Sequence, residues 1–92
     1  REDAKLFYMY LNQGLKNFLA KKLALPAEHL NRKNITEQLD AKGISNETAV
    51  QLQKLLDDID WQLYTPFVNN EKMQEHYYNT ADMILLLDTY RA

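Results

Sequence analysis

The sequence predicts an all-α fold: a single compact bundle of about four main helices plus a short helical turn. Two observations support this prediction. Helix-favouring residues dominate the 92-residue chain, which has only two Gly and two Pro, and that composition is typical of helical proteins. Apolar residues also recur every three to four positions through the long segments, the spacing of amphipathic helices. A chain of this length is expected to form one domain, over residues 1–92.

The first helix is expected from about residue 2 to 23 and should be the central one. Its core-facing stripe is Ala4, Phe7, Tyr8, Leu11, Leu15, Phe18 and Leu19. Lys21 and Lys22 suit the negative end of the helix dipole. Leu6, Met9 and Tyr10 point away from the stripe, so this helix is either covered on two sides or leaves apolar surface open.

Leu25-Pro26 should end this helix, because proline disfavours helical geometry in the residue before it. A short helical turn is expected at 27–30. Asn34, three residues before Glu37, resembles a capping box and predicts a helix that begins there and extends to Lys42. Gly43 is expected to end that helix in the left-handed conformation, and Ser45 to cap the next one.

The next helix is expected over residues 46–64. It should bury Ala49, Leu52, Leu55, Leu56, Ile59 and Leu63. Trp61 lies on the opposite side, and we expect a neighbouring segment to cover its indole. We predict that Trp61, Tyr64 and Pro66 form a structural corner that holds the turn between the last two long helices.

The last helix is expected to begin after a cap at Asn69 or Asn70 and to reach about Tyr90. Its core-facing stripe is predicted as Met73, Tyr77, Ala81, Ile84, Leu85 and Leu87. Large residues that lie off the buried stripes are the best candidates for a partner surface. They are Leu6, Met9, Tyr10, Met83 and Tyr90.

Few residues could carry catalysis or bind a metal. The chain has one serine, Ser45, at a helix-cap position, two histidines, His29 and His76, and no cysteine. No His-Glu-x-x-His motif is present, and the carboxylates at 57, 58 and 60 diverge by about 100° per residue around one helix. We therefore predict no enzyme activity, no catalytic residues, no metal ligands and no cofactor. An enzyme or a metal-binding domain remains an alternative.

Charge is unevenly distributed along the chain. Residues 1–33 hold seven basic and three acidic side chains, a net charge of +4, while the remainder holds four basic and ten acidic ones, a net charge of −6. A basic first helix is compatible with contact to an anionic membrane surface as well as with ordinary solvation. The segment 30–44, with Arg32 and Lys33 at its start, superficially resembles a small nucleic-acid-binding domain. The overall acidic balance opposes that alternative, so no nucleic-acid partner is predicted.

Several short motifs, in this order and spacing, resemble the C-terminal soluble domain of BatD-type aerotolerance proteins. They are Phe7-Tyr8, Leu23-Ala24-Leu25-Pro26, Leu30-Asn31-Arg32-Lys33-Asn34-Ile35, Leu39 with Gly43-Ile44-Ser45, Leu56-Asp57 through Tyr64 and Pro66, and Met73 with Tyr77 and Ala81. Together they span nearly the whole chain.

The resemblance implies a bacterial, membrane-anchored protein with an exported N-terminal region and a late transmembrane segment. This domain would follow that segment, on the cytoplasmic face of the inner membrane. The absence of an initiator Met before Arg1 agrees with a piece excised from a longer protein. The implied partners are other Bat-type membrane proteins, of the von Willebrand A-type or tetratricopeptide kind, linked to oxidative stress. No catalytic residues come with the family, so the expected function is a non-catalytic protein–protein interaction module.

Overall fold

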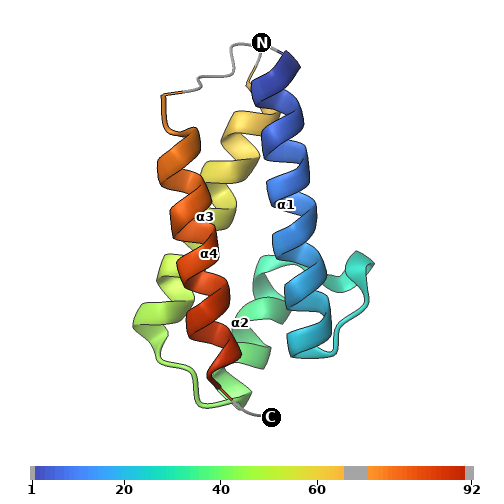
Figure 1. Cartoon of the computed structure of the whole chain (residues 1–92). Helices are drawn as coiled ribbons and strands as arrows, with labels where there is room; N and C mark the ends of the chain where they lie inside the picture. The colour runs from blue at the N-terminus through green and yellow to red at the C-terminus, as the bar shows by residue number, and fades with distance from the viewer. Residues whose placement is uncertain (1, 66–70, 91–92) are drawn as a thin grey trace.

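The protein is a bundle of helices, seen in a computed structural model that describes residues 2–65 and 71–90. In chain order the elements are α1 (Glu2–Leu23), the 3₁₀ turn η1 (Ala27–His29), α2 (Arg32–Ala41), α3 (Asn46–Tyr64) and α4 (Met73–Asp88). The all-α prediction is confirmed. α1 and α4 run in the same direction, α3 runs antiparallel to both, and the short α2 lies near the C-terminal end of α1 (Figure 1).

Two helices end in the same hydrogen-bonded motif. At the end of α2, Gly43 adopts a φ of 77° and the Ile44 N–H donates to Leu39 O at 3.0 Å. At the end of α1, Ala24 adopts a φ of 54° and the Leu25 N–H donates to Ala20 O at 3.0 Å. Both are Schellman caps. The glycine could be predicted from sequence, whereas Ala24 holds a conformation that its Cβ disfavours.

The start of α2 differs from the prediction. Its N-cap is Asn31, whose side-chain oxygen accepts a hydrogen bond from the Asn34 N–H at 2.8 Å. Asn34 lies inside the first turn, and its side-chain amide donates to His29 O at 2.9 Å. Asn34 therefore links the first turn of α2 to η1 instead of capping the helix.

The core lies where α1 meets the other elements, each of which packs against it. Its completely buried side chains come from all four helices, and they are Tyr8, Leu15, Leu19 and Leu23 of α1, Leu39 of α2, Leu52 and Ile59 of α3, and Leu87 of α4. The predicted stripe of α3 is buried except for the half-buried Leu63. The prediction of α1 as the central helix is confirmed.

The buried face of α4 was predicted only in part: Leu87 is buried as expected, and Met73 and Ile84 pack against the core. The helix buries His76, Thr80, Met83 and Leu87, whereas two members of the predicted stripe, Tyr77 and Leu85, are 52% and 67% exposed. Apolar and aromatic residues surround almost the whole circumference of α4, so apolar periodicity alone does not choose a face. The buried face includes the polar residues His76 and Thr80.

Candidate functional site

The only histidine in the core, His76, forms a polar contact between α1 and α4. Its Nδ1 lies 2.7 Å from the hydroxyl of Tyr8, and the two rings meet edge to face with centroids 5.5 Å apart. Tyr8 is completely buried and His76 is 4% exposed. Phe7 packs edge to face against Tyr8 on its other side. The contact satisfies two polar groups that would otherwise be buried without partners.

The surroundings of this pair favour its neutral form. Burial lowers the pKa of His76 below its ordinary value, although the carboxylates of Asp58 and Glu75 act in the opposite direction. Burial also raises the pKa of the Tyr8 phenol, and the same two carboxylates add to that effect. Depending on its tautomer, the neutral imidazole accepts a hydrogen bond from the phenol at Nδ1 or donates one from Nδ1–H to the phenol oxygen. The pair joins α1 to α4 inside the core.

The other groups considered for catalysis are also engaged or dispersed. Ser45 caps α3: its Oγ accepts the Thr48 N–H at 3.2 Å and donates to Thr48 Oγ1 at 3.0 Å. His29 lies exposed in η1. Within the described residues, no group of three or more His, Asp or Glu side chains has the arrangement of a metal site.

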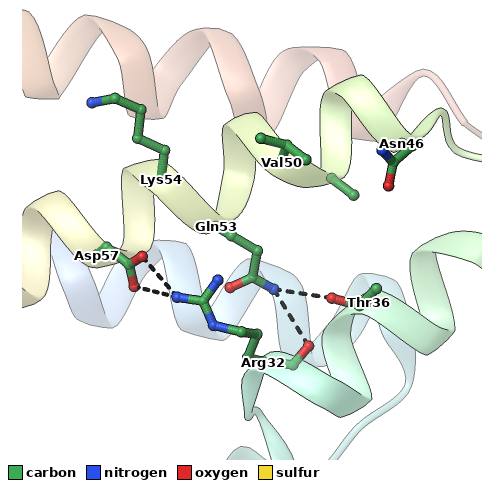
Figure 2. Close-up of a pocket in the computed structure, with 8 residues that line it drawn as sticks. Arg32, Thr36, Asn46, Val50, Gln53, Lys54 and Asp57 are labelled. Atoms are coloured by element: carbon green, nitrogen blue, oxygen red, sulfur yellow. Dashed lines mark hydrogen bonds and ion pairs between the residues drawn. The ribbon is translucent and has the colours of Figure 1, made fainter.

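A shallow hollow of about 370 Å³ lies between α2 and α3, and we call it the α2/α3 groove (Figure 2). Arg32 donates through Nη2 to both carboxylate oxygens of Asp57, at 2.9 and 2.7 Å. The Gln53 amide donates to Arg32 O and to Thr36 Oγ1, each at 3.4 Å. Figure 2 shows that Lys54 extends away from these groups. The polar side chains satisfy one another and join α2 to α3.

A second hollow, of about 260 Å³, lies between α1 and α4 and is mainly apolar. This α1/α4 groove is lined by Tyr10, Leu11, Gly14 and Leu15 of α1 and by Tyr77, Thr80, Ala81 and Ile84 of α4. The hydroxyl of Thr80 is buried, with no hydrogen-bond partner among the described residues. The side chains along this groove therefore differ in kind from the paired polar groups of the α2/α3 groove.

Three of the five candidate partner residues lie on the surface. Leu6, Met9 and Tyr10 are 47%, 51% and 72% exposed on the outer side of α1. The other two were placed wrongly. Met83 is buried in the core at 7% exposure, and Tyr90 is half-buried and packs against the core. The error at Met83 follows from the choice of buried face on α4, whereas Tyr90 lies just beyond the end of that helix.

The expected burial of Trp61 is also wrong. Its side chain is 69% exposed, and Tyr64, one turn further along the segment, is 81% exposed. No described segment covers this side of α3, because α1, α2 and α4 pack on its other faces. Pro66, the third residue of the predicted corner, lies outside the described residues. Its role in the turn stays a prediction.

Two lysines of the basic α1 bond to other helices. Lys5 Nζ donates to Leu63 O and Thr65 O at the end of α3, and Lys22 Nζ donates to Tyr90 O just after α4. Cations at these positions complement the negative ends of the helix dipoles. They tie α1 to the ends of α3 and α4, in addition to any role at a membrane. None of the helices in the described residues is long and apolar enough to cross a bilayer.

Sequence reasoning missed the pairing of Tyr8 with His76 and the burial of Thr80. The available signal was the spacing of His76, Thr80, Met83 and Leu87, which is helical but begins with two polar residues. Comparisons of the chain with protein-family models, with curated proteins and with solved structures gave no match.

Proposed function

We propose that this domain is a non-catalytic protein–protein interaction module that binds its partner through the outer surface of α1. This outer surface consists of Leu6, Met9 and Tyr10. Met9 and Tyr10 lie three and four positions after Leu6, so each neighbours Leu6 on the helix surface, and each of the three is about half exposed or more. Neighbouring large apolar side chains on a protein surface are typical of interaction sites, and tyrosine is a frequent anchor.

The proposed partners come from the resemblance to BatD-type proteins. We infer that the domain belongs to a membrane-anchored envelope protein and faces the cytoplasm. There it would bind von Willebrand A-type or tetratricopeptide proteins of an aerotolerance system. Its own contribution is a preformed helical face, because the outer surface of α1 stands on the completely buried Tyr8, Leu15 and Leu19 of the same helix. A rigid face binds with a smaller loss of conformational entropy than a flexible one.

The nucleic-acid alternative has less support. The guanidinium of Arg32, which leads the segment that resembles a nucleic-acid-binding helix pair, is held by Asp57 on α3. Its charge is thereby partly neutralised. Phosphate binding requires clustered and available positive charge. Salt-sensitive retention on immobilised DNA or heparin would favour nucleic acid over the interaction module.

The test is a binding titration of the purified domain against von Willebrand A-type and tetratricopeptide proteins of one Bat system. Changing both Met9 and Tyr10 to Ser should weaken binding at least about tenfold, because the apolar anchors of the interface are lost. The matched control changes Trp61 and Tyr64 to Ser, which removes equally exposed side chains from α3. Equal loss in both variants, or no binding by the unmodified domain, would contradict the proposal.

A further inference from the structure

α1 carries a second stripe of residues, two of which, Tyr10 and Gly14, line the α1/α4 groove. We call it the flank stripe, and its members are Asp3, Phe7, Tyr10, Gly14, Asn17 and Lys21. Their spacing alternates between four and three residues over the whole helix, as in one seam of a coiled coil. All are exposed except Phe7, which is half-buried.

The flank stripe is complementary to itself in an antiparallel arrangement. When two copies of one helix pack antiparallel about a two-fold axis, facing residues have numbers that add to a constant. With the axis midway between Tyr10 and Gly14, Tyr10 of each copy faces Gly14 of the other. The same axis places Asp3 against Lys21 of the second copy, and Phe7 against Asn17. Every member of the stripe therefore meets another member.

The central pair combines a protruding side chain with an open position. Tyr10 is 72% exposed, and a Cβ added at Gly14 would meet no atom within 4 Å. The phenol ring of one copy can therefore lie over the bare backbone of the other. Because the two-fold axis repeats the Tyr10–Gly14 contact, two tyrosine rings are removed from water together.

The outer pair supplies charge complementarity. Asp3 and Lys21 lie at opposite ends of α1, both exposed, so a parallel arrangement would place like charges together. An antiparallel arrangement forms two opposite-charge pairs instead. Exposed pairs contribute little affinity but select orientation and partner. The helix dipoles of α1 and its copy also favour the antiparallel direction.

The other wall of the α1/α4 groove fits the same axis. The groove is lined by residues 10–15 of α1 and 77–84 of α4, so Ala81 lies near the level of the axis. Tyr77 and Leu85 lie four residues to either side of Ala81 and are 52% and 67% exposed. The axis brings Tyr77 of one copy towards Leu85 of the other. Apolar contacts therefore extend from α1 onto α4.

We propose that the occupant of this face is a second copy of the chain, joined in a two-fold dimer in which the two α1 helices pack antiparallel along their flank stripes. This inference rests on the proposed function, since it assigns part of the exposed surface of α1 to an identified partner. Tyr10 belongs both to the outer surface of α1 and to the flank stripe. Dimer dissociation therefore controls access of other proteins to the outer surface of α1.

The first experiment is sedimentation velocity of the purified chain over a range of concentrations. The expected result is a reversible monomer–dimer equilibrium. Replacing Tyr10 with Glu should raise the dissociation constant at least about tenfold, because a charge replaces the central anchor. The control Tyr64→Glu changes an equally exposed tyrosine on α3 and should leave it unchanged.

Charge reversal tests the arrangement itself. Asp3→Lys alone places two lysines together at each end of the seam, and Lys21→Asp alone places two aspartates together, so each variant should dimerise about tenfold more weakly. Each variant also weakens α1 itself through the helix dipole, and circular dichroism measures that separately. Mixing the two variants restores both opposite-charge pairs, so heterodimers should form where neither variant forms homodimers.

A strictly monomeric chain would overturn the dimer, as would a dimer insensitive to Tyr10→Glu or a mixture without heterodimers. The proposed function fails separately. A monomeric chain that still binds a Bat-type protein through Met9 and Tyr10 would refute only the dimer. A dimer that binds no such protein would refute only the proposed partners.

Discussion

The α2/α3 and α1/α4 grooves differ in how their helices are joined. α2 and α3 are connected by an exposed ion pair, with Arg32 and Asp57 side chains 63% and 59% exposed. α1 and α4 are connected by a neutral pair, Tyr8 and His76, that is almost entirely buried. The polar side chains along the α2/α3 groove bond to one another. The α1/α4 groove is mainly apolar, and no described segment covers it.

This difference indicates which groove suits a partner. In the α2/α3 groove, a ligand would have to displace hydrogen bonds that the side chains already form, and gain little in return. In the α1/α4 groove, a partner removes apolar surface from water without breaking a bond between described side chains. We therefore expect substitutions in the two regions to change the free energy of unfolding by different amounts, and with different dependence on pH and salt.

The largest effect should come from the floor of the α1/α4 groove. Leu15→Ala removes a completely buried side chain and should lower the free energy of unfolding by about 2–5 kcal/mol. Leu85→Ala, at an exposed position of α4, is the control and should change the free energy of unfolding by less than about 0.5 kcal/mol. Denaturant unfolding at concentrations where the chain is monomeric measures both. Equal effects would mean that the groove has no packed floor.

The polar link between α1 and α4 should rank second. Tyr8→Phe keeps the ring but leaves the buried Nδ1 of His76 without its partner, which should cost about 1–3 kcal/mol of unfolding free energy. Adding His76→Leu removes the orphaned nitrogen, so the double variant should be less destabilised than the sum of the single ones. Strictly additive losses in denaturant unfolding would show that the 2.7 Å contact contributes no coupling.

The same comparison shows what could be predicted from the sequence. On α3, Leu52, Leu56 and Ile59 form a narrow stripe between polar faces, so the helix bounds and buried side followed directly. On α4, apolar residues surround the helix, and its buried side includes His76, which contacts Tyr8 68 residues away. A contact across such a separation has no signature in local periodicity.

The candidate partner surface was predictable only on α1, for the same reason. Leu6, Met9 and Tyr10 lie opposite a well-defined stripe, and their exposure follows from it. Met83 required the correct face of α4, and Tyr90 the path of the chain just after that helix. Trp61 was expected to be covered because it is large and apolar, but single exposed aromatic residues are common. The grooves depend on how helices lie against one another, which no single helix determines.

Mild acid should weaken the α1–α4 link more than the α2–α3 link. Because folding lowers the pKa of His76, the unfolded chain binds its proton first. Stability should therefore be constant above the unfolded pKa of about 6.5, and should fall as the pH drops below it towards the folded pKa. Asp58 and Glu75 limit this loss, and Lys72 and Lys54 add to it.

Denaturant unfolding between about pH 7.5 and 5.5 measures this loss against His76→Leu, in which the histidine contribution is absent. The matched control is His29→Gln, which removes the exposed histidine of η1. This control should lose stability with acid as the unmodified chain does. A pH dependence that persists in His76→Leu would assign the titration to other groups.

The smallest effect should come from the ion pair of the α2/α3 groove. Both side chains are more than half exposed, so water and salt screen their attraction even though both Asp57 oxygens accept from Arg32. A double-mutant cycle with Arg32→Gln and Asp57→Asn should give a coupling of about 0.2–1 kcal/mol, and it should decrease as salt is raised. The cycle uses the Lys54–Asp58 pair, also exposed, as its reference. A salt-independent coupling above about 2 kcal/mol would mean that the groove shields its charges as a buried site does. In that case the polar links of the two grooves would contribute similar free energies, and the α2/α3 groove would be an equally suitable place for a partner to bind.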